Sequence, residues 1–334
     1  MAPNGNIFGT AGAKDLINLI RTHTLPFTLL MALVATGIAG LLPSFPLFLV
    51  GQLALVIIVT VACTVLMGGA GLLALSSAAF MAIGGYGVLI LIGKVGVPLL
   101  VAVPMTVVAG AAVGAVLGFI TLRISGFYLA IATLGFLQVL LVAIKQGGAL
   151  TGGGYGLVVP MLDSRFLPEL TSGRLALVSL FTMIVVVGLA VNLMRSRVGR
   201  ALIALRDNEA AAQMQGINVS LMKISAFAFS SSLICLAGVL HAFLLGAIHP
   251  GGYTMNLSVF HITLVVVGGM TGSIIGAVLA PLVLYLLPEV FSTLGEWRDV
   301  FYGTILLVTL VFMPLGISSK LQPLLKRVIA DKPA

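Results

Sequence analysis

Long apolar runs, separated by short segments that hold glycine, proline or charged residues, fill most of the sequence. A helix needs about 20 apolar residues to cross the hydrocarbon of a bilayer, and most of the runs approach that length. The runs fall at about 25–42, 47–66, 76–93, 97–120, 127–144, 175–194, 224–247, 258–270, 274–291 and 300–316. We therefore predict an all-α integral membrane protein with about ten transmembrane helices, in one domain over residues 25–317.

Glycines recur every four residues in two of these regions. The two sets are Gly110, Gly114 and Gly118 in the fourth run, and Gly268, Gly272 and Gly276 between the eighth and ninth runs. Small residues let membrane helices approach closely, and this interpretation fits the first set. The second set leaves two alternatives open, because its glycines can pack helices or can open the backbone of a broken or re-entrant pair that lines a cavity.

The charged residues are few and unevenly placed. They make up 8% of the chain, beside 60% hydrophobic residues, whereas soluble domains carry about 25% charged residues. A net charge of +8 would suggest a nucleic-acid partner in a soluble protein, but cations between spans mark the cytoplasmic side. With the N-terminus inside, the inward segments hold Lys14, Arg21, Arg123, Arg195, Arg197, Arg200, Arg206, Lys223, Lys320, Lys326, Arg327 and Lys332, and the outward segments hold Lys94, Lys145, Arg165, Arg174 and Arg298. We expect residues 1–24 and the basic tail 318–334 to be cytoplasmic.

The polar residues do not form a recognisable catalytic, metal or cofactor site. The chain has nine carboxylates and four histidines, without the H-E-x-x-H spacing of a zinc enzyme or a phosphate-binding G-x-x-x-x-G-K-[ST] loop. The two cysteines lie in apolar runs, where a thiol behaves as a core residue. The histidines are His23, His241, His249 and His261, and an interfacial or helix-bridging role is favoured over a role in a solute path.

The longest inward segment, 195–223, is predicted to contain a short amphipathic helix. Ser196 is a suitable N-cap, and Gly216 can end the helix after Gln215. Arginines and acids lie among alanines and leucines, which gives an apolar face and a charged rim. Two positions for this helix stay open: the groove of another protein or the anionic inner leaflet of the membrane.

Within this segment, Glu209-Ala210-Ala211-Ala212-Gln213-Met214-Gln215-Gly216-Ile217 resembles the E-A-A, three residues, then glycine motif of ABC-importer permeases. Further stretches fall in the order of the LivM-like branched-chain amino acid permease family. They are Gly68–Phe80 continuing to Tyr86, Gly126–Leu134, Leu150–Leu157, Val267–Ser273, Leu287–Glu289 and Pro314–Gly316. The resemblance covers about residues 50–317.

This resemblance implies a type II ABC-importer-like fold that forms half of a translocation channel in a bacterial inner membrane. The implied partners are a second, related permease in a heterodimer, two ATPase subunits that bind ATP and Mg²⁺, and an external solute-binding protein. The chain itself would carry no catalytic residue, cofactor or metal. Its ATPase-coupling residues would be Arg200, Arg206, Asp207, Glu209, Ala210, Ala211 and Gly216.

Hydroxyl, aromatic and glycine residues at interrupted helices are the candidates for the path. They are Ser76, Ser77, Tyr86, Tyr128, Thr133, Thr151, Gly152, Gly153, Gly268, Gly269 and Thr271. Freed backbone groups there could meet a zwitterionic amino acid, although each side chain could instead bond to its own helix. Ser76-Ser77 and Gly154-Tyr155 depart from the family pattern, so leucine, isoleucine and valine stand beside urea or short amides as expected solutes. An ATP-independent secondary transporter is the other alternative.

Overall fold

A computed structural model describes residues 36–37, 43–124, 126–158, 172–269 and 272–290. In this part of the chain, seven helices are long and apolar enough to cross a membrane. The elements are α3 (Ser44–Thr64), a π-helical turn η1 (Val65–Gly69), α4 (Ser77–Ile90), η2 (Leu91–Val95), α5 (Leu99–Ile120), η3 (Thr121–Arg123), α6 (Phe127–Gln146), η4 (Gly153–Tyr155), β1 (Leu157–Val158), α7 (Ser172–Arg195), α8 (Arg197–Asp207), α9 (Glu209–Met214), α10 (Val219–Leu245), β2 (Ala247–Ile248), η5 (Pro250–Gly252), α11 (Met255–Gly268) and α12 (Ile274–Val290).

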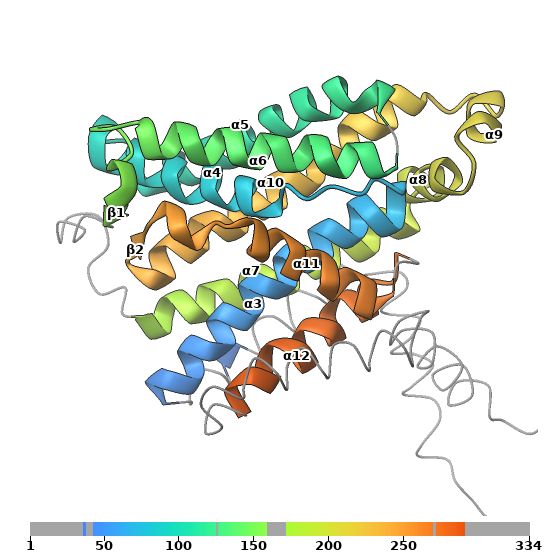
Figure 1. Cartoon of the computed structure of the whole chain (residues 1–334). Coiled ribbons are helices and arrows are strands. Elements are labelled where there is room, and N and C mark those ends of the chain that lie inside the picture. Colours follow the sequence, from blue (N-terminus) through green and yellow to red (C-terminus); the bar gives the residue numbers. More distant parts are fainter. Residues whose placement is uncertain (1–35, 38–42, 125, 159–171, 270–271, 291–334) are drawn as a thin grey trace, which may run out of the picture.

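The helices form a bundle around α10. Figure 1 shows α4, α5 and α6 along one side and α3, α7 and α12 along the other, and α10 contacts α3, α4, α5 and α7. The main core cluster joins residues from both sides through leucine, isoleucine, valine and alanine side chains. These long helices are apolar on all faces, which is typical of helices that are surrounded by other helices or by lipid.

The glycines of α5 allow this helix to lie close to α10. A methyl group at Gly110 would lie 2.7 Å from Cβ of Cys235, and one at Gly118 would lie 3.0 Å from Cα of Ile224. A methyl group at Gly114 would overlap the Ser231 hydroxyl. The packing role predicted for these three glycines is confirmed.

The other glycine series forms the junction of α11 and α12. A methyl group at Gly268 would lie 2.6 Å from the carbonyl oxygen of Gly276, so the two helices touch backbone to backbone. Gly269 and Gly272 have φ of 110° and 77°, in the left-handed region, and they reverse the chain direction between the helices. At 14 residues, α11 is about 21 Å long at 1.5 Å per residue. Helices α11 and α12 therefore form a hairpin, and their backbones are in contact at Gly268 and Gly276.

Eight of the ten predicted runs coincide with helices α3–α7 and α10–α12. The run at 300–316 lies outside the described residues, and so does the run at 25–42 except for residues 36–37, which are helical. The predicted all-α fold is confirmed for the described residues, and its one addition is a short antiparallel ladder between β1 and β2. Leu157 pairs with Ile248, and Val158 pairs with Ala247. This ladder connects the segment after α6 to the segment after α10, so both helices end on one side of the molecule.

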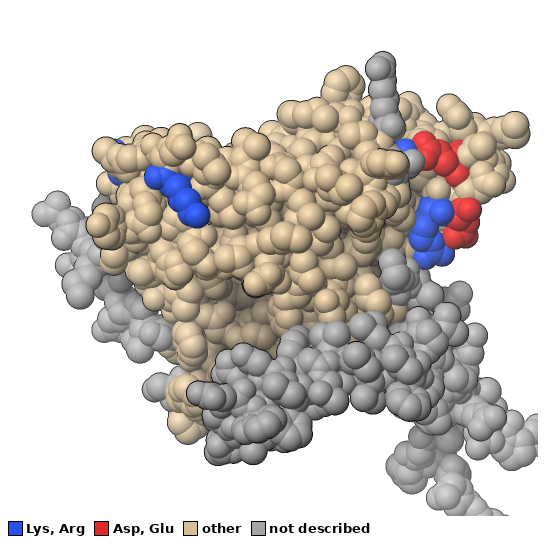
Figure 2. Space-filling model, viewed as in Figure 1, with Lys and Arg blue, Asp and Glu red and all other residues tan. Residues whose placement is uncertain are grey.

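Charged side chains gather at the two ends of the bundle. Figure 2 shows an uncharged band between one end with basic residues and another with both basic and acidic residues. The second end lies at α8 and α9 in Figure 1, opposite the β1–β2 ladder. An uncharged band between two charged ends is the arrangement expected for a protein that lies in a bilayer.

Candidate functional site

The chain leaves helical geometry between α3 and α4, and we call residues 71–76 the break. After the π-helical turn η1, Gly71 has φ of 71° and residues 71–76 have no regular secondary structure. The N–H of Leu72 still donates to the carbonyl of Leu66 at 3.1 Å. Non-helical backbone at membrane depth is tolerated only where protein buries it or where it lines a cavity. The break is therefore a candidate functional site.

Buried polar side chains from α6 and α11 hold the break. The N–H of Leu75 donates to Thr133 Oγ1 at 2.8 Å, and the N–H of Ala78 donates to Ser258 Oγ at 3.0 Å. Ser77 Oγ lies 3.1 Å from His261 Nδ1. All four side chains are buried, so these bonds replace the water that the backbone would otherwise need.

A small cavity lies beside the break. Its polar lining is made of hydroxyl groups from the start of α4 and the middle of α10. The lining residues are Cys63, Leu66, Met67, Ala74, Ser76, Ser77, Phe80, Phe227, Ser230, Ser231 and Ile234, none of which is charged. The cavity has room for about one water molecule, and its lining offers hydroxyl groups without a charged side chain.

Only part of the predicted path set meets here. Ser76, Ser77 and Thr133 surround the break. Tyr86 lies elsewhere, buried, with its ring 6.3 Å from that of Tyr253, and its hydroxyl has no hydrogen-bond partner in the described structure. Tyr128 is 76% exposed on α6.

The remaining candidates of that set belong to other segments of the chain. Thr151 Oγ1 donates to the Ile144 carbonyl at the end of α6. Gly152 and Gly153 have positive φ in the following loop, and Gly268 and Gly269 form the α11–α12 junction. Thr271 lies outside the described residues.

Ser258 and His261 belong to the site although the sequence did not place them there. They lie three residues apart and share one face of α11, and both contact the start of α4. The expectation that the histidines bridge helices agrees with these contacts, since His241 Nδ1 also lies 3.4 Å from the Tyr253 hydroxyl. His249 is exposed, and His23 lies outside the described residues. The available signal was a serine and a histidine at helical spacing in an apolar run.

The inward segment forms two helices, so the prediction of a single amphipathic helix was wrong. The Ser196 hydroxyl caps α8 by accepting from Gly199, as expected. Asn208 is extended, with φ of −160°, and its side chain accepts from Ala211 to cap α9. Asparagine prefers such a capping position to a helix interior. Gly216, with φ of 81°, ends α9, because the N–H groups of Gly216 and Ile217 bond back to Gln213 and Ala212.

The apolar face of α8 packs on the chain's own break. Leu202 and Leu205 are 1% and 4% exposed, and both belong to one cluster with Leu66, Ala70, Leu72 and Ala74. The sequence left two alternatives for this apolar face, the groove of another protein or the inner leaflet of the membrane. These contacts within the chain agree with neither. Arg206 adds a polar contact, because its Nη1 donates to the Gly68 carbonyl at 2.7 Å. The helix is therefore a support for the break.

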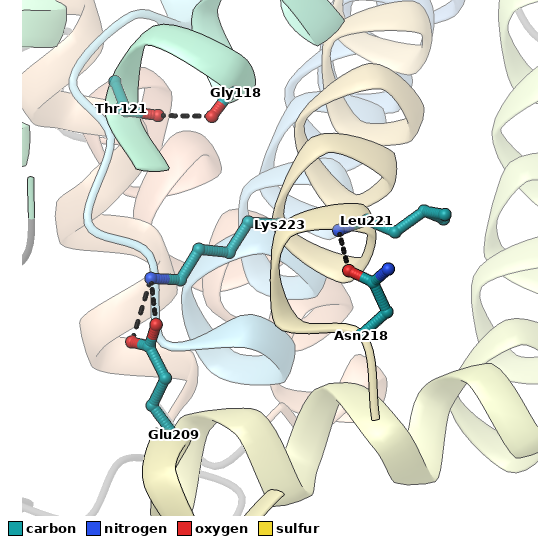
Figure 3. A network of polar contacts seen from close by, with 6 residues as sticks. All are labelled: Gly118, Thr121, Glu209, Asn218, Leu221 and Lys223. Atoms are coloured by element: carbon teal, nitrogen blue, oxygen red, sulfur yellow. Dashed lines mark hydrogen bonds and ion pairs between the residues drawn. The ribbon is translucent and has the colours of Figure 1, made fainter. Parts of the chain in front are cut away.

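Helix α9 is tied to α10 by an ion pair. Figure 3 shows Lys223 extending from α10 to the carboxylate of Glu209, with Nζ at 2.7 and 2.8 Å from the two oxygens. The Lys223 side chain is 6% exposed and that of Glu209 is 50% exposed. Asn218 caps α10 beside this pair by accepting from Leu221. Glu209, predicted as a coupling residue, thus has a partner inside its own chain.

The outer surface of α9 has no cover in the described structure. Its exposed residues are Glu209, Ala210, Ala211, Gln213 and Met214, followed by the exposed C-cap Gln215, and Met214 is 91% exposed. Figure 1 shows α9 at the far end of the molecule, beyond the transmembrane bundle. Alanines and an exposed methionine leave a smooth, adaptable surface on which another protein can pack.

Comparison with known proteins decides the family. Residues 45–310 match the family model described as branched-chain amino acid transport system / permease component. The chain belongs to this family. The permease is a multi-pass membrane component of an ABC importer and is not itself an enzyme, because ATP is bound by separate ATPase subunits in these importers.

Individual relatives support the same family. The permease is 28% identical to the high-affinity branched-chain amino acid transport system permease protein LivM of Salmonella typhimurium, and 29% identical to LivM of Escherichia coli; each match covers 81% of this chain and 69% of the relative. It is also 31% identical to the autoinducer 2 import system permease protein LsrC of Yersinia enterocolitica, over 57% of this chain and 53% of the relative. No solved structure matches the permease.

Proposed function

We propose that this permease carries branched-chain amino acids across a bacterial inner membrane as one half of a heterodimeric ABC-importer channel. An external solute-binding protein delivers the solute, and two ATPase subunits supply the energy. The observation that carries this proposal is the contact between α8 and the break, because it joins the charged end of the molecule to its buried polar site.

The break and its hydroxyl-lined cavity form the path in this proposal. Ser76, Ser77 and Thr133 offer hydroxyl groups, and the interrupted backbone has carbonyl and N–H groups near them. Broken helices of this kind meet polar solutes in other transporters. The described lining holds no charged side chain, which suits a neutral or zwitterionic solute that must leave again quickly.

Leucine, isoleucine and valine are the solutes that we propose. Matches to two proteins named as branched-chain amino acid permeases extend over 81% of the chain, against 57% for the match to the autoinducer 2 protein. Urea and short amides share the neutral, hydrogen-bonding character that the cavity suits, so they belong among the tested solutes.

The exposed surface of α9 is the docking surface for an ATPase subunit. Its position beyond the bundle and its exposed alanines and methionine support this role. The end of the molecule with α8 and α9 is then cytoplasmic. In the complete proposal both termini lie in the cytoplasm, and ten spans, two of them outside the described residues, form a type II fold.

The test combines copurification with ATPase measurements. The permease is expressed together with the second permease, the ATPase subunits and the solute-binding protein of its importer. ATP hydrolysis in proteoliposomes is then measured with leucine, isoleucine, valine or urea. Stimulation by the three amino acids supports the proposal. Stimulation by urea alone moves the solute to the amide class, and leucine uptake that continues without any ATPase subunit refutes ATP coupling.

A matched pair of variants tests the docking surface. Met214→Asp places a charge on the exposed surface of α9, and Tyr155→Asp places the same charge at a side chain that is 100% exposed near β1. We expect Met214→Asp to lower ATPase copurification at least about tenfold, as expected for a charge within an apolar contact. Tyr155→Asp should leave ATPase copurification unchanged, and equal copurification of both variants would place the docking surface elsewhere.

A further inference from the structure

Arg206 lies at the point where α8 meets the break. Its aliphatic stem crosses Gly71, since a methyl group there would lie 2.8 Å from Cγ of Arg206. Its Nη1 donates to the Gly68 carbonyl at 2.7 Å, across 138 residues of sequence. The side chain therefore contacts the chain immediately before the break and at its first residue.

Asp207 fixes the orientation of this guanidinium. Both Nε and Nη2 of Arg206 donate to Asp207 Oδ1, at 3.1 and 2.9 Å. With two donors held by the carboxylate, the third nitrogen is aimed at Gly68. Such a fork geometry is available to arginine and not to lysine, and a charge-assisted bond is stronger than a neutral one.

The Gly68 carbonyl also faces the α11–α12 hairpin. It lies in the last turn of η1, where carbonyl groups lack partners within the helix. A methyl group at Gly272, in the hairpin turn, would lie 2.9 Å from the Gly68 oxygen. One backbone group thus lies between α8 on one side and the hairpin that carries Ser258 and His261 on the other.

We infer that Arg206 is a positioning residue that makes α8 and the break move as one body, so that ATPase movement reaches the buried polar site. This inference rests on the proposed function. The apolar contacts of Leu202 and Leu205 can slide, whereas a directed bond to one carbonyl fixes the register of α8 on η1. Arg206 therefore transmits displacement along the chain without itself contacting the ATPase.

Arg197 is the matched control. It lies on the same helix, is exposed, and does not belong to the coupling residues that the family resemblance implies. Removing its charge changes the cytoplasmic surface of α8 by the same amount as removing that of Arg206. It leaves the contact with Gly68 in place.

The test measures movement at the break in the complete importer. Ser76→Cys, 3% exposed before substitution, is placed in a background with both natural cysteines replaced by alanine. The rate of thiol labelling by a methanethiosulfonate reagent is measured without nucleotide and after trapping with ATP and vanadate. We expect trapping to change the rate at least about fivefold, the size of a typical coupling between sites. Arg206→Met should abolish this change while the ATPases stay bound and hydrolyse ATP, and Arg197→Met should keep it.

The outcomes separate the two claims. A nucleotide-dependent change that persists in Arg206→Met overturns the role of Arg206. If the labelling rate does not change on trapping in the protein with Arg206 and Arg197 intact, this result counts instead against the break as the moving path. If Arg206→Met does not assemble, Arg206→Lys takes its place: a lysine cannot hold Asp207 and Gly68 together, so the change should fall by at least about half, and an undiminished change overturns the inference.

Discussion

Lys223 is a buried cation, and Glu209, its carboxylate partner among the described residues, is partly exposed. The Lys223 side chain is 6% exposed and that of Glu209 is 50% exposed. If Lys223 is removed, the partly exposed carboxylate of Glu209 can be solvated by water. If Glu209 is removed, the ammonium group of Lys223 stays buried without a partner, and an uncompensated buried charge is strongly destabilising. The two partners therefore differ in what their removal costs.

This asymmetry predicts unequal effects of two substitutions. Glu209→Ala strands the lysine and should lower the stability of the purified protein by about 2 kcal/mol, a value reduced from that of a fully buried pair because Glu209 is half exposed. Lys223→Met fills the same space with an apolar side chain and should cost less than about 1 kcal/mol. Thermal unfolding in detergent measures both effects.

The double variant Glu209→Ala with Lys223→Met is the control for this interpretation. Removing both charges together should restore most of the stability lost in Glu209→Ala, because no ammonium is then left without a partner. Additive losses in the double variant, or a larger loss for Lys223→Met than for Glu209→Ala, would contradict the proposed cost of the buried lysine.

At this scale the sequence predicted residue types better than contacts. Ser76, Ser77 and Thr133 could be chosen because hydroxyl groups beside an interrupted helix are few. His261 could not be assigned to Ser77, which lies 184 residues away in the sequence. Arg206 and Glu209 were selected for contact with another protein, yet each has a partner in this chain. A motif identifies its residues but does not reveal which of its polar groups are already paired.

Among the elements, the crossing of α5 and α10 depends on the absence of side chains. A methyl group at Gly114 would lie 2.6 Å from Cβ of Ser231 and 3.0 Å from the carbonyl oxygen of Phe227. The backbone of α10 cannot yield without moving the whole helix. On α6, by contrast, Gly135 has no heavy atom within 4 Å of such a methyl group.

Alanine at these two glycines should therefore have opposite effects. Gly114→Ala forces the helices apart and should destabilise the protein by about 1–3 kcal/mol, the usual cost of overpacking. Gly135→Ala fills open space and should be neutral or stabilising by up to about 1 kcal/mol, because alanine favours the helix. Melting temperatures in one detergent compare the two, and a loss for Gly135→Ala equal to that of Gly114→Ala would show that the close approach is not the cause.

Element positions were predictable because the bilayer fixes how long an apolar helix must be. Eight runs read from the sequence coincide with helices of the structure for this reason. The interruption at Asn208 was missed, although Asp207-Asn208 combines two residues that favour caps over helix interiors. The β1–β2 ladder has only two residues in each strand, and so short a strand has no measurable alternation of apolar and polar positions.

For the whole molecule, the directions of the helices determine at which of the two ends each charged residue lies. The ladder places the ends of α6 and α10 together, so α8 and α9, which precede α10, lie at the opposite end. The described basic side chains at the ladder side are Lys94, Lys145 and Arg174, and those at the α8–α9 side are Arg195, Arg197, Arg200, Arg206 and Lys223. The larger group marks the cytoplasmic side if the usual bias of lysine and arginine holds.

Orientation can be measured with single cysteines on the two sides. Lys145→Cys and Arg200→Cys replace exposed residues at opposite ends, in a background where the buried Cys63 and Cys235 are alanine. A membrane-impermeant maleimide added to intact cells should label the first variant and not the second, and permeabilised cells should show both. Labelling of Arg200→Cys in intact cells would place α8 and α9 outside. The ATPase-docking role of α9 would then be excluded, because hydrolysis of cytoplasmic ATP requires the ATPase subunits to bind on the inner side.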